Sequence, residues 1–238
     1  MFFSDKKKIL FIAAPKTGST SVEDILTSRI QDGQRFKIAL GERLITSKDV
    51  RSPSLGHAKA KEFRDVLGDK HYDDLTVFGF VRDPIEKVVS SYFFTRSGSI
   101  RRAFSIKSEK ARAPQIMKRI LAICSARVLP LSLWSLVYRM RSCADYFMDE
   151  DGMIIVDILG ATHRLGSDLV EIMRNVEVDF SPDDVPHTNR SKHRYPNEYI
   201  LFRFCIPLLE RRYKEDSQLF EKVRYRVWKN PDRKQQAW

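Results

Sequence analysis

The feature that most constrains the fold is a short apolar run followed by a polar turn and a helix start, within residues 8–24. The run from Ile9 to Ala14 is bounded by turn residues, which is the pattern of a strand buried on both faces, as in a parallel sheet. Gly18 then lets the backbone turn where a side chain would clash. A helix is expected to follow, with Thr20 and Glu23 spaced as a capping box.

This strand–turn–helix predicts an anion site. Backbone N–H groups at a helix N-terminus point toward one place, and the helix dipole adds positive potential there. Lys16 adds a full positive charge. The turn also offers hydroxyl groups as donors, from Thr17, Ser19, Thr20 and Ser21. The alternative interpretation is a helix that is simply well capped.

The turn differs from a Walker A loop, which needs G-x-x-x-x-G-K-[ST] with its lysine after the second glycine. Here Lys16 precedes the only glycine, and Ala13 and Ala14 stand where the first glycine is expected. A nucleotide kinase of P-loop type therefore remains only an alternative function. It would require ATP and magnesium.

A second strand–helix junction lies at Leu75–Phe94. The run Thr76–Val81 is rich in β-branched and aromatic residues and predicts a buried strand. Pro84 is well placed to open a helix. Arg82 at the strand's end and Ser90 two turns into the helix are predicted to bind one phosphate, with a guanidinium fork and a hydroxyl as ligands. The alternative is a surface arginine and a serine on a helix face.

Length, charge and cysteine content set the outer bounds. The 238 residues suit one domain, and 42 Lys and Arg against 31 Asp and Glu give a net charge of +11. This balance favours anionic partners. Cys124, Cys143 and Cys205 are too scattered for a disulfide framework or a zinc site, and the first residues lack the features of a signal peptide. We therefore expect a cytoplasmic protein.

Both motifs resemble those of sulfotransferases that use 3′-phosphoadenosine 5′-phosphosulfate (PAPS). PKTGSTS, from Pro15 to Ser21, resembles the loop that holds the 5′-phosphosulfate, and R-D-P-x-x-K-x-x-S-x-Y resembles the motif for the 3′-phosphate. Lys87 departs from this motif, because many relatives carry arginine there. The resemblance is to carbohydrate sulfotransferases of family 2 type, in a soluble member. It implies PAPS as co-substrate and no metal.

His57 is the predicted general base. Sulfuryl transfer requires the acceptor hydroxyl to lose its proton, and histidine is the side chain best suited to accept it near neutral pH. The segment His57-Ala58-Lys59-Ala60 also resembles the histidine segment of the family. Lys16 would neutralise charge on the group in transfer. The alternative is a histidine that lines the start of a helix expected over residues 55–67.

Further blocks extend the resemblance. Met153 to Leu159 predicts a third buried strand, with a helix following over residues 160–175. Residues 186–191 resemble a late P-H-x-N-x-S loop, so the basic stretch 187–194 either closes over the nucleotide or is a solvated loop. Residues 210–220 resemble the closing Y-x-x-D-x-x-L-F helix, whose expected role is packing. The tail from residue 230 onward is polar and is expected to fray.

The segment from about 98 to 150 matches no pattern of the family and is interpreted as a variable helical insertion. Residues 120–138 are strongly apolar, but Arg127 and Pro130 interrupt them before they reach the length of a membrane span. Basic residues on both sides suit a peripheral membrane contact through about 118–141. The preferred interpretation is instead a helix pair that forms the acceptor side of the active site or a dimer face, because buried helices of this kind are commoner.

We therefore expect an α/β fold: a three-layer parallel sheet with P-loop NTPase-like architecture, in a single domain over residues 1–238. The predicted function is transfer of a sulfuryl group from PAPS to a hydroxyl of a carbohydrate or glycolipid. No nucleic acid partner is expected. Besides the kinase, a non-enzymatic protein that binds polyanions or membrane surfaces is the remaining alternative.

Overall fold

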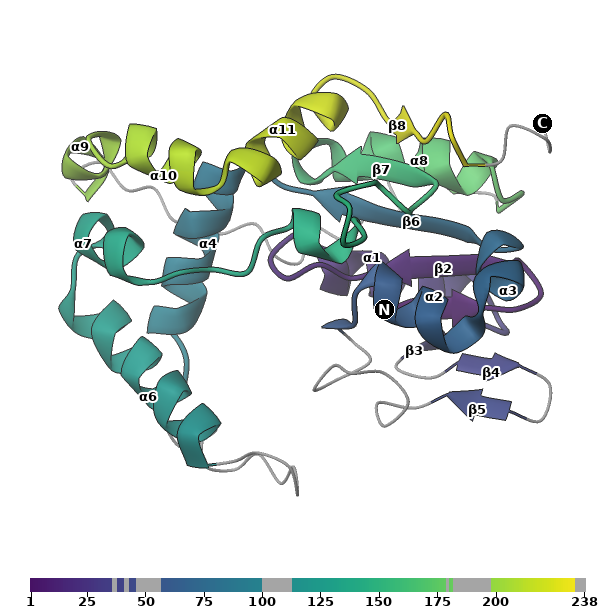
Figure 1. Cartoon of the computed structure of the whole chain (residues 1–238), viewed down its shortest axis with the longest axis horizontal. Coiled ribbons are helices and arrows are strands. Elements are labelled where there is room, and N and C mark those ends of the chain that lie inside the picture. The colour runs from purple at the N-terminus through teal and green to yellow at the C-terminus, as the bar shows by residue number, and fades with distance from the viewer. Residues whose placement is uncertain are drawn as a thin grey trace. The chain divides into compact units, whose positions relative to one another are not determined.

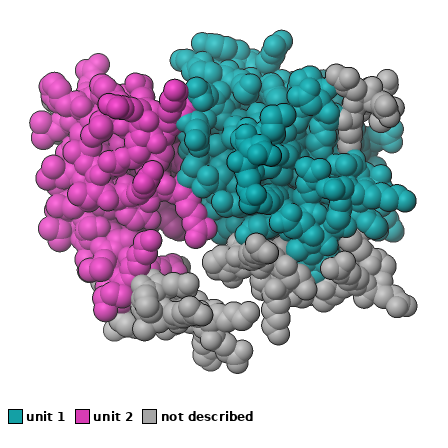
Figure 2. All heavy atoms as spheres, viewed as in Figure 1, with its two compact units in different colours: residues 1–83, 142–190, 215–238 teal, residues 84–141, 191–214 magenta. Residues whose placement is uncertain are grey.

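A computed structural model describes residues 1–35, 38–40, 43–45, 57–99, 113–178, 180–181 and 198–233. The chain divides into two compact units (Figure 2). Unit 1 comprises residues 1–83, 142–190 and 215–238, and unit 2 comprises residues 84–141 and 191–214.

Unit 1 is built on a six-stranded sheet in the order β3-β1-β2-β6-β7-β8 (Figure 1). The three central strands β2, β6 and β7 are parallel, while β1, β3 and β8 pair antiparallel. The predicted α/β fold is thus confirmed, and antiparallel edge strands are added to the expected parallel centre. The strands are β1 (Phe2–Ser4), β2 (Ile9–Ile12), β3 (Gln34–Arg35), β6 (Thr76–Val81), β7 (Ile158–Ala161) and β8 (Trp228–Lys229).

The central strands bury both faces, because successive side chains point to opposite sides of a sheet. In β2, Phe11 packs on the face that carries α1 (Ser19–Arg29) and α8 (Leu165–Arg174). Leu10 packs on the other face, which carries three more of the helices described for the unit. These are α2 (Ala60–Leu67), α3 (Asp69–Asp73) and α11 (Lys214–Val223). Unit 1 therefore has the three layers that the sequence predicted.

Smaller elements complete unit 1. Strands β4 (Ile38–Leu40) and β5 (Arg43–Ile45) form a separate antiparallel pair. There are two 3₁₀ turns, of which η2 (Ala144–Tyr146) precedes β7 in the chain and η3 (Thr162–Arg164) follows it. The second of these leads directly from β7 into α8.

Unit 2 is helical among its described residues. A core around Trp134 joins its helices, and Trp134 stacks on Tyr138 with 4.3 Å between ring centroids. Pro130 is the N-cap of α7 and so separates α6 from α7, as the interrupted apolar run predicted. The helices are α4 (Pro84–Arg96), α6 (Ala113–Val128), α7 (Leu131–Val137), α9 (Glu198–Arg203) and α10 (Ile206–Arg212). Within the described ranges, none is long and apolar enough to cross a bilayer.

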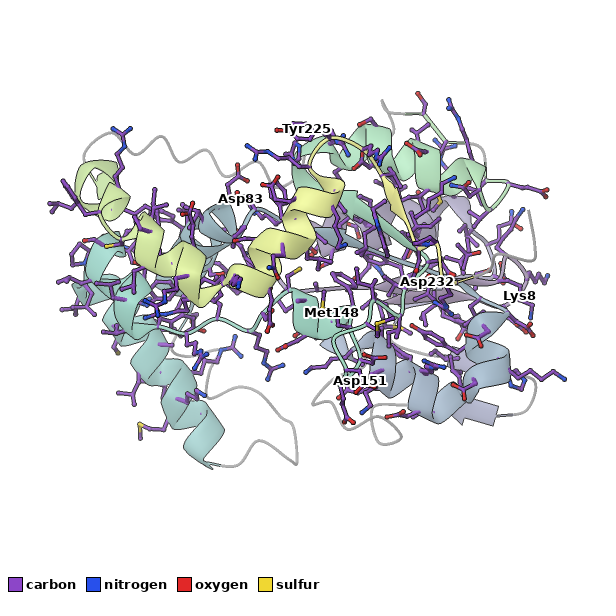
Figure 3. The ribbon with its side chains drawn as sticks, turned by 45° about the horizontal axis from the view of Figure 1, so that its top comes forward. Lys8, Asp83, Met148, Asp151, Tyr225 and Asp232 are labelled. Atoms are coloured by element: carbon purple, nitrogen blue, oxygen red, sulfur yellow. The ribbon has the colours of Figure 1, made fainter. Side chains whose placement is uncertain are left out.

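The third strand was predicted wrongly over Met153–Leu159. Ile154 instead pairs with Met148 in an isolated antiparallel bridge (Figure 3 labels Met148), and β7 begins only at Ile158. One reason lies at Asp157: its backbone N–H donates to the Val77 carbonyl at 2.7 Å, but the Val77 N–H donates to the Asp157 carboxylate, at 2.6 Å, rather than to a backbone carbonyl. The strand then runs to Ala161, and α8 starts later than expected.

The start of the C-terminal tail is anchored, contrary to the predicted fraying. The Asn230 side chain donates to the carbonyl oxygens of Ile154 and Val156, at 2.7 and 3.1 Å. Arg233 donates to the carbonyl of Ile155 at 2.7 Å and lies 4.3 Å from the ring centroid of Tyr72. The expectation for residues 234–238 lies outside the described residues.

Candidate active site

The ends of the three parallel strands place polar residues at one edge of the sheet. The loop of residues 13–18 follows β2, Arg82 follows β6, and Thr162 follows β7. Figure 3 shows Asp83, at this edge, and Lys8, which directly precedes β2, toward opposite ends of the sheet. In open α/β sheets ligands bind beyond the carboxyl ends of the strands, so this edge is the candidate site.

The backbone of the loop after β2 is unusual at two positions. Lys16 and Gly18 have φ angles of 69° and 78°, in the left-handed region. Glycine adopts this conformation freely, but a lysine there costs roughly 1 kcal/mol or more. The hydroxyl of Thr17, between them, donates to the carbonyl of Ala14 at 2.8 Å and stabilises the turn. Strain of this kind concentrates at functional sites.

Thr162 ties the loop to the other two strands. Its hydroxyl oxygen lies 3.1 Å from the carbonyl oxygen of Val81 and 3.3 Å from that of Thr17, so its single proton is shared between the two. Sequence reasoning missed this residue. The available signal was its position, because Thr162 is the first polar residue after the third strand, as Arg82 is after the second.

Arg82 is bound to the same loop. Its Nη1 atom donates to the carbonyl oxygen of Lys16 at 3.3 Å. Burial, followed by the nearby Arg82 charge, lowers the pKa of Lys16 to about 8. The structure therefore brings together the two cations that the sequence had predicted as phosphate ligands in separate motifs.

His57 also lies against this edge. Its Nδ1 atom is 3.2 Å from the carbonyl oxygen of Ala13, at the end of β2. Because a carbonyl can only accept, Nδ1 carries the proton, and the lone pair of the neutral ring is on Nε2. His57 precedes the helix rather than opening it, since α2 begins at Ala60.

The hydroxyl residues of the turn divide into two groups. Ser19 and Thr20 are in the first turn of α1 and are not buried, while Ser21 is buried. The predicted capping box is wrong, because the N-cap is Gly18 and it makes no side-chain capping bond. The Glu23 carboxylate instead lies 2.6 Å from the amino group of Met1.

The second motif continues onto α4 in unit 2, which carries its Lys87 and Ser90. Ser90 is partly buried there, and its predicted sharing of a phosphate with Arg82 stays a prediction. Lys87 is 2 % exposed, and its Nζ donates to the carbonyl of Arg141 at 2.9 Å. This lysine therefore has a packing role within unit 2. The predicted basic stretch 187–194 lies outside the described residues.

Comparison with protein families identifies the family of the chain. The model of the sulfotransferase family matches residues 1–223, which is nearly the whole chain. No curated protein and no solved structure matches the chain. The match includes the loop after β2, the Arg82 junction and the block around β7. The chain therefore belongs to the sulfotransferase family, whose domain supports sulfuryl transfer.

Proposed function

We propose that this protein transfers the sulfuryl group of PAPS to a hydroxyl group of a carbohydrate or glycolipid acceptor. The observation that carries the proposal is the hydrogen bond from Arg82 to the carbonyl of Lys16 at the carboxyl ends of the strands. It lies in a loop where Lys16 and Gly18 have left-handed φ angles. Burial and the nearby Arg82 charge lower the pKa of Lys16, and the attraction of a bound anion offsets both effects.

The residues of the loop fit a phosphosulfate. The backbone N–H groups of residues 17–20 stand at the N-terminus of α1, where the helix dipole favours an anion. Lys16 adds charge beside them, and Ser19 and Thr20 add hydroxyls. Since the Thr17 hydroxyl already donates to Ala14, its backbone N–H is the group offered to the ligand. Ser21 is buried, at 5 % exposure.

PAPS supplies an activated sulfuryl group when bound, and the chain supplies position, charge and a base. Lys16 stabilises negative charge on the oxygen that leaves and on the group in transfer. Arg82 holds a phosphate of the nucleotide, with Ser90 as its proposed partner. His57 takes the acceptor proton on Nε2, because its Nδ1–H is held by Ala13.

Three further points belong to the proposal. A single sulfotransferase domain over residues 1–238 is supported by the family match, which covers residues 1–223. The acceptor class rests on the resemblance to carbohydrate sulfotransferases and on the net charge of +11, which suits anionic glycans and lipids. A cytoplasmic location is supported by the three cysteines, all of which are free thiols.

The test is a calorimetric titration with 3′,5′-adenosine bisphosphate, the desulfated product, beside ATP with magnesium and AMP. We expect tight binding of the bisphosphate alone. Arg82→Ala should weaken it at least tenfold, because a charged hydrogen bond contributes roughly 1.5–3 kcal/mol. Arg174→Ala, at an exposed position on α8, is the matched control. Preference for ATP with magnesium would overturn the proposal in favour of a kinase.

A further inference from the structure

The net positive charge of the chain comes from unit 2 (magenta in Figure 2). The sequence of this unit contains 18 Lys and Arg against 4 Asp and Glu, whereas that of unit 1 contains 24 against 27. The formal net charges are therefore +14 and −3. Unit 2 is thus the part of the chain that attracts an anionic partner.

Helix α6 of this unit exposes an apolar stripe. Its members follow one another at intervals of four, three and four residues, which places them on one face of a helix with 3.6 residues per turn. They are Met117, Leu121, Cys124 and Val128, here called the α6 stripe. Met117, Leu121 and Val128 are 56 %, 61 % and 80 % exposed, and Cys124 is exposed as well. The stripe is about 17 Å long at 1.5 Å per residue.

The opposite face of α6 is the one that packs into unit 2. Ile123 and Ala126 are 3 % and 0 % exposed, and Ala126 belongs to the core around Trp134. The helix therefore has two apolar faces, of which the core of unit 2 covers one. A contiguous exposed apolar face on a soluble unit marks an interaction surface.

Basic side chains flank the α6 stripe. At about 100° per residue, Lys118 lies on one side of it and Arg127 on the other. Both are exposed. The sequence of α6 contains no Asp or Glu. An apolar stripe between basic side chains is the chemistry of a helix that lies in the plane of an anionic membrane surface.

We propose that α6 docks unit 2 on an anionic lipid membrane. The α6 stripe enters the boundary between headgroups and acyl chains, while Lys118 and Arg127 lie against lipid phosphates. A second copy of the chain fits the surface less well, because it would bring another unit of charge +14 against the first. Nucleic acid also fits less well, since bases are stacked on aromatic side chains and the α6 stripe has none.

The first experiment is flotation of the full chain with vesicles of phosphatidylcholine, with and without phosphatidylserine. We expect binding only to the vesicles that contain phosphatidylserine, and weaker binding as the salt concentration rises. Replacing Lys118 and Arg127 by glutamine should reduce affinity about fivefold for each charge removed. Arg174→Gln, in unit 1, is the matched control and should bind as the unchanged protein does.

The apolar contribution is tested by the triple variant Met117→Gln, Leu121→Gln, Val128→Gln. These side chains are exposed, so the thermal unfolding midpoint should not change, while vesicle affinity should fall more than about tenfold. Met153→Gln, at a residue of unit 1 that is 56 % exposed, is the matched control. Undiminished vesicle binding by the triple variant would overturn the proposal.

Cys124 provides a direct probe in the unchanged sequence. It is exposed, whereas Cys143 and Cys205 are buried, so a polarity-sensitive fluorophore will label position 124 selectively. Its emission should shift to the blue with vesicles containing phosphatidylserine. Binding without that shift, or no binding to any vesicle, would overturn the proposal. The proposal would also be overturned by a dimer of the unchanged chain that the triple variant abolishes. RNA binding that is as strong in the triple variant as in the unchanged chain would overturn it as well.

Discussion

The Nη1 atom of Arg82 donates a hydrogen bond to the carbonyl oxygen of Lys16 over 3.3 Å. This bond joins the end of β6 to the loop after β2 and keeps the two cations side by side. Burial and the Arg82 charge lower the pKa of Lys16 to about 8. Positive groups fixed in place before an anion arrives need little reorganisation during the reaction, which is the basis of electrostatic catalysis.

Nucleotide binding should depend on pH through Lys16. The bound anion favours the charged lysine, so it raises the pKa of Lys16 above its value of about 8 in the free protein. Affinity for 3′,5′-adenosine bisphosphate should therefore be highest below pH 8 and should fall as the pH rises through 8. Calorimetry between about pH 7 and pH 9.5, in two buffers of different ionisation enthalpy, should show proton uptake near pH 8. Lys16→Met should remove this dependence, and equal affinity across the range would contradict it.

Replacing His57 should separate chemistry from binding. His57→Ala removes the proposed base, so turnover should fall by roughly a hundredfold or more. Affinity for 3′,5′-adenosine bisphosphate should stay within about twofold, because His57 contacts the protein through Ala13 and is not a proposed ligand of the nucleotide. His71→Ala, at an exposed histidine on α3, is the control. Full turnover in His57→Ala would remove its assigned role.

Thr162 should matter for the shape of the loop. Thr162→Val keeps the side-chain volume but loses the hydroxyl that bridges Val81 and Thr17. We expect a loss of about 1 kcal/mol in the free energy of unfolding and several-fold weaker nucleotide binding. Thr162→Ser should restore both, because it keeps the hydroxyl. Thr27→Val on the exposed side of α1 should leave affinity unchanged, and an unaltered affinity in Thr162→Val would argue against a positioning role.

Asp216 should be a major determinant of stability. It is fully buried, and its Oδ1 atom accepts the backbone N–H groups of Cys143 and Ala144, at 2.7 and 3.0 Å, together with the Ser142 hydroxyl. Asp216→Ala removes this shared acceptor, leaving the Ala144 N–H with the Ser142 Oγ at 3.1 Å, and should lower the free energy of unfolding by roughly 3 kcal/mol. Urea denaturation measures this loss. Glu215→Ala, at the neighbouring exposed residue, should change stability by less than about 0.5 kcal/mol.

Metal removal should leave turnover unchanged. The proposed site neutralises charge with Lys16 and Arg82, so no step assigned to the chain requires a divalent ion. The rate with PAPS should be the same with EDTA as with added magnesium. A rate that falls in EDTA and returns with magnesium would contradict the charge roles assigned to these two residues.

Local sequence was sufficient for the elements that carry the two predicted motifs. Thr76–Val81 is a strand with the predicted bounds, and Pro84 opens the helix that follows it. These predictions succeeded because apolar periodicity and proline act within a few residues. The third strand was misplaced because the Asp157 carboxylate accepts the backbone N–H of Val77 on the neighbouring strand. Apolar periodicity cannot reveal such a contact.

The sequence by itself determined the α/β fold, the loop after β2 and the residue types of the candidate site. Only the tertiary structure decided that Lys16 has φ of 69°, that Arg82 binds its carbonyl, and that Thr162 lies between two strand ends. Arg82 and Thr162 stand 66 and 145 residues from their partners in the loop. Contacts over such separations depend on the order in which strands pair, and no local pattern encodes that order.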